Sequence, residues 1–514
     1  MSKAIMTTGN FTPYGGAVPI LKKIKEFGLP QVIRSSLGVR KKQSKYGYDD
    51  VFIAWALTTL CGGTRLDHIT KLKKKFNVIP KLKLPSHDVI GRVFKQLADD
   101  INVYKSTYIK NVKDAPKKKK EKIKVTKIVR GKHIITDRKV IKNKKEIKTY
   151  KVDAQNFVCD NIKLNNMLVK ATKRMGGLRE GQSYTLHIDA TFVETNSSNS
   201  EQYYNSTDSR RYGFNPMVCV IQKFPVYISM RNGNSSSDFQ LKECIENCLD
   251  ILSKNKIKVG KVIIDGAGYH RATIDFLHQK GIKFIISAPV NKYFKSMLEK
   301  VRSNENWKNA IWETGHGYRN CEVSSVLYSM TGLPYDLRIV AARHLTKDSI
   351  IAYSNLEEQR QLANNEQKLI ALAKKGRIKK QDRKYEGDWR EIGNYKYRFI
   401  ITNDFSMQPE KVITSYNKRG NDIERKFDEM KNFFGWKLPP FSQMNENGVF
   451  LIAAALSNNI YYSIISNFKS KIPELRKPIR LGEFKFLFID VVCEYVGKGF
   501  YKFINPLVPY DKLM

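Results

Sequence analysis

Between residues 182 and 290, short apolar runs alternate with amphipathic segments, and this alternation limits the possible folds more than any other feature of the chain. Five runs have the length and apolar content of buried strands: 184–188, 218–222, 225–230, 261–264 and 282–287. Two intervening segments have the spacing of amphipathic helices: 238–253 and 271–279. The order of three strands, a helix, a strand, a helix and a strand predicts an α/β fold.

Two aspartates, Asp189 and Asp265, come directly after predicted strands. The carboxyl ends of parallel strands lie along one edge of a sheet, where α/β proteins form their sites. Taken singly, each aspartate is better interpreted as a turn or capping residue, but together, in this strand order, they favour a functional site. His187 precedes Asp189 by two residues and shares its strand face, where a core histidine is the favoured interpretation.

A third acidic residue lies on a later predicted helix. The helical spacing there is carried by four apolar residues: Ile423, Phe427, Met430 and Phe434. They predict a helix that begins near Gly420 and packs against the core. Glu424 and Lys431 are seven residues apart and therefore share one flank, two turns from each other. Tyr416 and Arg419 come just before the expected start of the helix.

These side chains suit phosphate and metal chemistry, because a carboxylate can hold a divalent cation while lysine, arginine and tyrosine can hold phosphate. Two plainer interpretations remain open: Asn421 and Glu424 have the spacing of a capping box, and Lys431 can be an ordinary solvated lysine. If the helix packs on the sheet, Glu424 can join Asp189 and Asp265 around hard cations. Two such ions about 4 Å apart can activate an attacking oxygen and stabilise a leaving one, as phosphodiester displacement requires.

The strand order, with one acid on the first strand, one after the fourth and one on a late helix, resembles the ribonuclease-H-like fold. The chain resembles the DDE transposases of bacterial insertion sequences, in the group with a Tyr-Arg-Glu-Lys signature and a β-rich insertion before the last helix. The signature is matched by Tyr416, Arg419, Glu424 and Lys431, with one residue more between arginine and glutamate than in its commonest form. Four further motifs match: Ile188-Asp189-Ala-Thr191, Tyr212-Gly-Phe-Asn-Pro216, Arg231-Asn-Gly-Asn234 and Asp265-Gly-Ala-Gly-Tyr269.

The resemblance implies a role for each matched residue. Asp189, Asp265 and Glu424 would be catalytic and would bind two Mg²⁺ ions, for which Mn²⁺ can substitute. Tyr416, Arg419 and Lys431 would bind DNA phosphates near the cleaved transposon end. Trp436 lies just past this group and is a candidate for stacking on a flipped base, with a packing tryptophan as the equally good alternative.

The resemblance also implies the reaction and the partners. A transposase would cut at the ends of its element, free a 3′-OH and direct that hydroxyl at target DNA, without a covalent enzyme–DNA intermediate. Relatives with this signature cut the second strand through a hairpin, which implies cut-and-paste transposition. The partners would be double-stranded DNA, as terminal inverted repeats and as target, and a second copy of the chain, since synapsis of two ends usually needs a homodimer.

The composition supports a polyanionic partner. The 514-residue chain has a net charge of +42, and nucleic acid is the commonest ligand of so basic a protein. Its seven scattered cysteines lack zinc spacing and predict reduced core thiols. No secretion signal and no membrane span are expected, so we predict a cytoplasmic, nucleoid-associated protein. The apolar segment 449–465 is interrupted by polar residues and predicts a buried helix.

Six regions are expected, and they are set apart by composition and pattern. They are a helical N-terminal DNA-binding region (1–112), a basic segment that is an arm or an insertion (113–151), the first part of the ribonuclease-H-like core (180–290), a β-rich insertion (291–394), the second part of the core (395–480) and a C-terminal packing segment (481–514). Within the first region, Ser86 predicts the start of a helix that either enters DNA or simply packs.

Two other functions remain open on the sequence alone. One is a different ribonuclease-H-like DNA nuclease, which would cut DNA that lacks inverted repeats equally well. The other is a catalytically retired transposase that is kept as a DNA-binding protein, against which the three intact acids argue.

Overall fold

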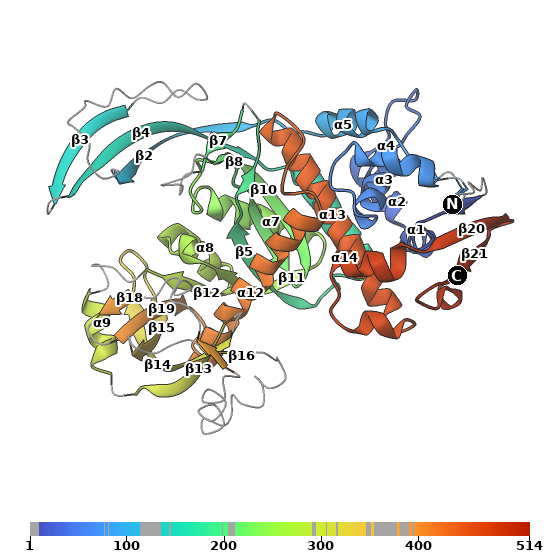
Figure 1. Cartoon of the computed structure of the whole chain (residues 1–514). Helices are drawn as coiled ribbons and strands as arrows, with labels where there is room; N and C mark the ends of the chain where they lie inside the picture. Colours follow the sequence, from blue (N-terminus) through green and yellow to red (C-terminus); the bar gives the residue numbers. More distant parts are fainter. Residues whose placement is uncertain are drawn as a thin grey trace, which may run out of the picture.

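A central run of five strands reproduces the predicted alternation (Figure 1). The strands are β5 (Ser183–Ala190), β9 (Met217–Ile221), β10 (Phe224–Arg231), β11 (Lys258–Ile264) and β12 (Lys283–Ala288), and the helices between them are α7 (Leu241–Lys254) and α8 (Arg271–Gln279). They pair in the order β10–β9–β5–β11–β12. β5, β9 and β10 are antiparallel, whereas β11 is parallel to both β5 and β12. The predicted strand and helix order is therefore confirmed.

The structure is a computed structural model. It describes residues 10–76, 78–80, 82–113, 135–142, 145–197, 199–203, 211–289, 295–304, 306–314, 317–345, 351–353, 378–380, 390–392 and 395–514.

The two faces of the sheet belong to different hydrophobic clusters, because side chains alternate along each strand. Leu186 and Ile188 of β5 lie in one cluster with α7 and α8. Val218 and Val220 of β9 lie in another, together with the long helix α13 (Met444–Phe468). Asp189 follows Ile188 and pairs with Val218, so its side chain is on the α13 side of the sheet.

The helix expected from about Gly420 begins earlier than predicted. α12 (Pro409–Phe433) starts with a proline in its first turn, and Gly420 lies in its interior. The first turns are held by Val412 and Ile413, which are buried against strands of the sheet. Because Glu424 is therefore far from the N-terminus of the helix, the capping-box interpretation with Asn421 is wrong.

Helix α13 is buried through most of its length, as predicted for 449–465. It is long and apolar enough to cross a membrane, but 89% of its most apolar window is buried inside the protein, as in the core helix of a globular domain. Its polar residues Asn458 and Asn459 donate hydrogen bonds to the carbonyls of Lys223 and Pro225, at 3.2 and 3.0 Å. These bonds attach α13 to the β9–β10 turn.

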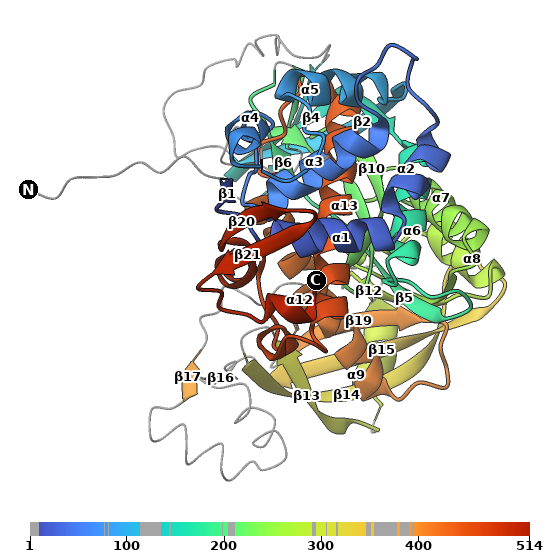
Figure 2. The same ribbon diagram turned by 90° about the vertical axis from the view of Figure 1, so that its right-hand side faces the viewer.

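Five helices lie in the described part of the first hundred residues, and the first, third and fifth of them pack against α13 (Figure 2). They are α1 (Ala17–Glu26), α2 (Leu29–Leu37), α3 (Tyr48–Leu60), α4 (His68–Lys73) and α5 (His87–Gln96), followed later by α6 (Ile162–Arg174). Ser86 is the N-cap residue of α5, as predicted, and Ile90, Val93 and Phe94 of this helix are buried. The helical region ends sooner than expected, because residues 102–113 form a strand.

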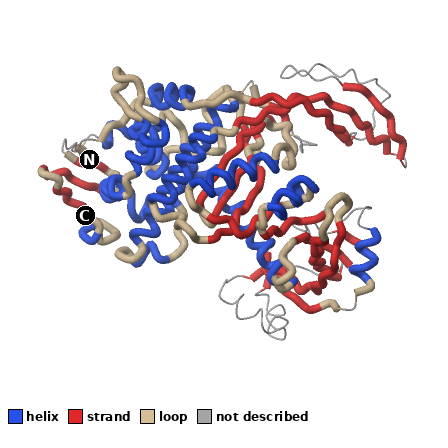
Figure 3. The backbone as a smooth tube through the Cα atoms, turned by 180° about the vertical axis from the view of Figure 1, so that it is seen from behind, coloured by secondary structure: helices blue, strands red, loops and turns tan. Residues whose placement is uncertain are grey.

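That strand, β2 (Asn102–Lys113), belongs to an arm with β3 (Ile135–Lys142) and β4 (Lys145–Cys159). The arm extends away from the rest of the chain (Figures 1 and 3). Twelve residue pairs join β2 to β4, but only two pairs join β4 to β10 of the central sheet. The hairpin turn that the basic sequence suggests around Arg130 lies outside the described residues.

A second set of strands follows β12. It contains α9 (Lys295–Arg302), β13 (Lys308–Thr314), β14 (Gly317–Ser329), β15 (Asp336–Leu345), β16 (Ile351–Tyr353), β17 (Ile378–Lys380), β18 (Arg390–Ile392) and β19 (Tyr395–Thr402). β19 pairs with both β12 and β15, so it returns the chain to the central sheet directly before α12.

The remaining elements are short. They are β1 (Phe11–Thr12), β6 (Val193–Glu194), β7 (Glu201–Gln202), β8 (Tyr212–Phe214), α14 (Leu481–Phe484), β20 (Val492–Gly497) and β21 (Phe500–Ile504), with single helical turns at Lys74–Phe76, Gly266–Gly268, Pro473–Arg476, Lys485–Ile489 and Tyr510–Lys512. β1 pairs with β20, so the two ends of the described chain share one small sheet (Figure 2). All seven cysteines are free and buried, as predicted.

Candidate active site

The two aspartates predicted to meet at the edge of the sheet are neighbours. Ile188 of β5 pairs with Ile264 of β11 in parallel register, so Asp189 and Asp265 follow side by side. Asp189 Oδ1 accepts a hydrogen bond from the backbone N–H of Ala190 at 2.9 Å. Asp265 Oδ1 accepts one from Ala267 at 3.0 Å and caps the helical turn there. Each carboxylate is therefore oriented by its own backbone.

Helix α12 brings an arginine between these carboxylates. Arg419 Nη2 lies 2.6 Å from Asp189 Oδ2 and 3.9 Å from Asp265 Oδ2. The arginine side chain is 7% exposed, and those of Asp189 and Asp265 are 17% and 33% exposed. One buried guanidinium thus compensates two carboxylates that come from different strands.

The electrostatics of the site are dominated by burial. Burial raises the pKa of Asp189 to about 7; the charge of Arg419 opposes this rise, while Asp265 and Glu424 reinforce it. Burial alone would lower the pKa of Arg419, but Asp189 and the other anionic groups more than offset it and raise the pKa above its ordinary value. The site therefore favours a bound positive charge.

Glu424 is exposed, and its charge acts on both Asp189 and Arg419. In the part of the chain that the structure describes, no three acidic, histidine or cysteine side chains converge where they could hold a metal ion. In this conformation, Arg419 lies between the two aspartates. Glu424 adds a third negative charge nearby, but the three carboxylates do not converge on one point.

Tyr416 lies one turn before Arg419 on α12, is 3% exposed and packs its ring beside the guanidinium of Arg419. Its ring centroid lies 5.9 Å from the guanidinium carbon of Arg419 and 4.6 Å from that of Arg398 on β19. Such distances are typical of cation–π contacts. The sequence gives no indication that Arg398 belongs to the site, because it is 21 residues before Arg419. Only the pairing of β19 with β12 and β15 places it beside Tyr416.

Lys431 lies two turns beyond Glu424 and is half-buried. Burial lowers its pKa, the nearby charge of Arg211 lowers it further, and Asp428 opposes both. Arg211 itself forms a salt bridge of 3.3 Å with Glu194. Two cations are thus close together on the flank of α12 that also carries Glu424.

His187 is buried, as the favoured interpretation of the sequence predicts. Burial and, as the smaller cause, the positive charge of Arg419 lower its pKa to about 4, so the imidazole is neutral at physiological pH. It lies on the same strand as Asp189 and contributes no charge to the site.

Trp436 is not placed where a DNA base could stack on it. Its side chain is fully buried, and its indole N–H donates a hydrogen bond of 3.2 Å to the carbonyl of Leu451 on α13. Gly435, with φ of +85°, makes the turn that directs the tryptophan into the core. The prediction of a DNA contact is therefore wrong for this conformation, and the packing interpretation holds.

We expect Trp436→Ala to lower the free energy of unfolding by about 3–5 kcal/mol, because it leaves a cavity in the core and removes the hydrogen bond to Leu451. Chemical denaturation measures this loss. Trp436→Phe keeps most of the buried ring, so its affinity for DNA should equal that of the unaltered protein. A selective loss of DNA affinity in the folded phenylalanine variant would contradict the structural role.

The family model described as the transposase DDE domain matches residues 180–460, which is more than half of the chain. Among solved structures, the chain is similar to a piggyBac transposase synaptic complex with hairpin DNA, determined by cryo-EM. The sequence identity is 10%, the TM-score is 0.39, and the match covers 91% of this chain and 79% of that one. No curated protein matches the chain.

Proposed function

The chain belongs to the transposase DDE domain family, and we propose that it catalyses cut-and-paste transposition of a bacterial insertion sequence. The observation that carries this proposal is the convergence of Asp189 and Asp265 on one cation from adjacent parallel strands. Its substrates would be double-stranded terminal inverted repeats and target DNA, handled by a homodimer in the synaptic complex. Second-strand cleavage would proceed through a hairpin, as in relatives with the Tyr-Arg-Glu-Lys signature.

The strand arrangement supports a ribonuclease-H-like catalytic core. The central strands follow the spatial order third–second–first–fourth–fifth, with the fourth and fifth parallel to the first. The acids of that fold belong on the first strand, after the fourth and on a late helix, which are the places of Asp189, Asp265 and Glu424. Residues 180–290 and 395–480 would form this core, and 291–394 its insertion.

The donor set fits a hard divalent cation. Asp189, Asp265 and Glu424 offer only carboxylate oxygens, and the first two already share the positive charge of Arg419. These three residues would hold two Mg²⁺ ions, with Mn²⁺ as a substitute. Bound there, the ions would supply activation of the attacking oxygen and stabilisation of the leaving one.

The protein's own cations would hold and orient the DNA. Arg419, once it leaves the aspartates, can reach phosphate from the same helix turn, with Tyr416 packed beside it. Lys431 and Arg211 add two positive charges along the flank of Glu424. The helices α1 to α5 and the basic arm of β2, β3 and β4 would contact DNA outside the site and add affinity through its backbone.

The test is cleavage of DNA that ends in the inverted repeats flanking the gene, with Mg²⁺ or Mn²⁺ and with EDTA. We expect metal-dependent hairpin products on repeat ends and strand transfer into a plasmid, neither of which forms on shuffled ends. Equal cleavage of shuffled DNA without strand transfer would identify a different nuclease.

One observation favours a second candidate. Because no three-carboxylate site is formed among the described residues, a catalytically retired DNA-binding protein fits the conformation with Arg419 between the aspartates. That function predicts binding to inverted-repeat DNA with no metal-dependent product, and the same assay decides between the two.

A further inference from the structure

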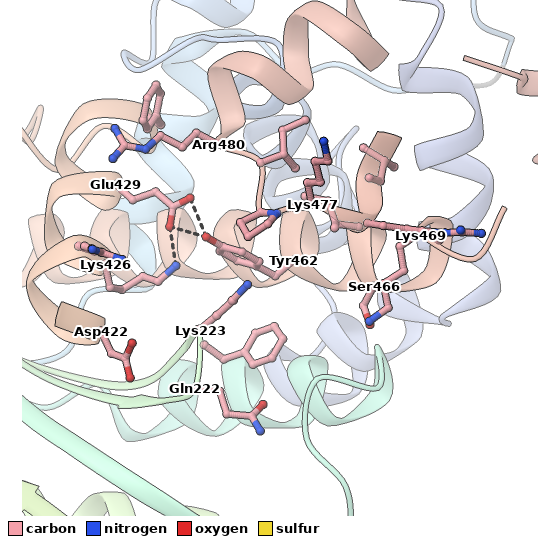
Figure 4. Close-up of a pocket in the computed structure, with 18 of the residues that line it drawn as sticks. Gln222, Lys223, Asp422, Lys426, Glu429, Tyr462, Ser466, Lys469, Lys477 and Arg480 are labelled. Atoms are coloured by element: carbon pink, nitrogen blue, oxygen red, sulfur yellow. Dashed lines mark hydrogen bonds and ion pairs between the residues drawn. The ribbon is translucent and has the colours of Figure 1, made fainter. Parts of the chain in front are cut away.

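A cavity of about 780 Å³ lies beside α12 (Figure 4), and its lining includes neither Asp189 nor Asp265. It is lined by Asp422, Arg425 and Glu429, which recur at spacings of three and four and so share one flank of the helix. Glu424 and Lys431 lie on the other flank. The β9–β10 turn, α13 and the segment 475–480 close the remaining sides.

The floor of the cavity is a closed network of polar side chains (Figure 4). Lys426, 4% exposed, donates to Glu429 at 2.5 Å and to Asn458 at 3.1 Å. The hydroxyl of Tyr462 donates to the same glutamate at 2.9 Å. Burial lowers the pKa of Lys426 to about 8, against the opposing charge of Glu429. Because the charges of Lys426 and Glu429 cancel, the floor of the cavity presents no net charge to a ligand.

The rim has a large excess of positive charge. Six exposed cationic side chains surround the opening: Lys223, Arg425, Lys469, Arg476, Lys477 and Arg480. Within the described residues none of the six forms a salt bridge, and only Asp422 and Asp428 add negative charge to the lining beyond the paired Glu429. Six like charges around one opening repel one another, so an anionic ligand with several charges would relieve them.

Between floor and rim the cavity also presents apolar surface. Phe433, Tyr462 and Ile465 line it and are only partly buried. The ammonium of Lys223 lies 5.0 Å from the ring centroid of Tyr462. Cations that follow a phosphate backbone, interleaved with aromatic and aliphatic surfaces for bases, are the recurrent composition of single-strand binding sites.

We propose that this cavity binds a short single-stranded segment of DNA, separate from the strand at the aspartates. Its volume is that of a small-molecule pocket, so it admits a few unpaired nucleotides and not a base-paired helix. The rim cations would hold phosphates while Phe433 and Ile465 contact bases. The proposal rests on DNA being the substrate, and it places an unpaired strand on the far flank of the helix that carries Glu424.

The first experiment neutralises the rim. The triple variant Arg425→Gln, Lys469→Gln, Lys477→Gln is compared with a matched triple of exposed lysines outside the cavity, Lys170→Gln, Lys258→Gln, Lys300→Gln. Fluorescence anisotropy with an oligo-dT of about 20 nucleotides in EDTA measures affinity and its salt dependence. We expect the rim triple to bind on the order of 10- to 100-fold more weakly than the control triple, with a salt slope smaller by about 2. Equal affinities for the two triples would overturn the proposal.

The second experiment reports on the cavity itself. Ser466 lines the opening and is exposed, and because all seven native cysteines are buried, Ser466→Cys introduces the one accessible thiol. Oligo-dT should slow its alkylation by maleimide at least about tenfold, while Ser303→Cys, exposed on another surface, should react at an unchanged rate. If the thiol of the Ser466→Cys variant stays unprotected with oligo-dT fully bound, the site is overturned. Protection by inorganic tripolyphosphate but not by oligo-dT would instead identify a small polyanion as its ligand and would also overturn the proposal.

Both readouts are taken in EDTA and need no cleavage. Failure of the proposed transposition therefore appears as missing metal-dependent products with normal oligo-dT protection, whereas failure of the cavity proposal appears as normal cleavage with an unprotected thiol.

Discussion

Asp189→Asn is expected to slow metal-dependent cleavage of inverted-repeat ends at least about 10³-fold, which corresponds to roughly 4 kcal/mol in the barrier. The amide keeps the size of the carboxylate and can still accept the hydrogen bond from Ala190. It removes the negative charge that a hard cation needs. Binding of the same DNA in EDTA should stay within about threefold, because phosphates contact cations and not this acid.

Two comparisons make this result interpretable. Asp250→Asn makes the same change in an exposed acid on α7 and should cleave normally. The second comparison is the pH dependence of stability. Burial raises the pKa of Asp189 to about 7, so the folded protein binds this proton more tightly than the unfolded chain does. The contribution of Asp189 to the free energy of unfolding therefore falls as the pH rises from about 4 to 7. Asp189→Asn should therefore lose no stability relative to the unaltered protein on going from about pH 5 to about pH 8. Undiminished cleavage by Asp189→Asn would remove the case for this site.

Arg419→Gln is expected to destabilise the metal-free protein by about 3 kcal/mol, since removing one member of a buried ion pair leaves the other charge uncompensated. Here two carboxylates lose their cation, although the partial exposure of Asp265 moderates the effect. Mg²⁺ should restore much of the loss, because a ligand that binds only the folded state stabilises it. Urea denaturation with EDTA and with Mg²⁺ measures both quantities.

The matched control is Arg398→Gln, which removes the other guanidinium against the ring of Tyr416 but leaves the pair between Arg419 and Asp189. Whatever its effect on stability, that effect should not depend on Mg²⁺. If Arg419→Gln also responds to Mg²⁺ no more than the unaltered protein does, then arginine and metal do not share the place between the aspartates.

The sequence predicts that Asp189 and Asp265 lie at the same edge of the sheet, because both come at the end of an apolar run. Both residues end apolar strands, and a parallel pair places such ends side by side. The start of α12 could not be located in the same way. Gly420 resembles a helix boundary and costs a helix interior about 1 kcal/mol, but the burial of Val412 and Ile413 against the sheet outweighs it.

Two other features depended on contacts distant in sequence. Trp436 is close in sequence to a predicted DNA-binding lysine, but Gly435 directs its ring inward to Leu451. Arg398 joins the site only through the pairing of β19. The strand 102–113 did leave a local signal, because its valines, tyrosines, threonine and isoleucine suit a strand, but the abundant lysines obscured it.

The arm formed by β2 and β4 is a long antiparallel strand pair that joins the central sheet through a short contact with β10. Twelve residues of strand span roughly 40 Å at about 3.3 Å per residue, which is close to the length of one turn of duplex DNA. Two residue pairs join β4 to β10, and the side chain of Asn232 adds hydrogen bonds to Phe157 and Gln155 beside them. If DNA is the substrate as proposed, the arm would reach along a duplex by about one helical turn.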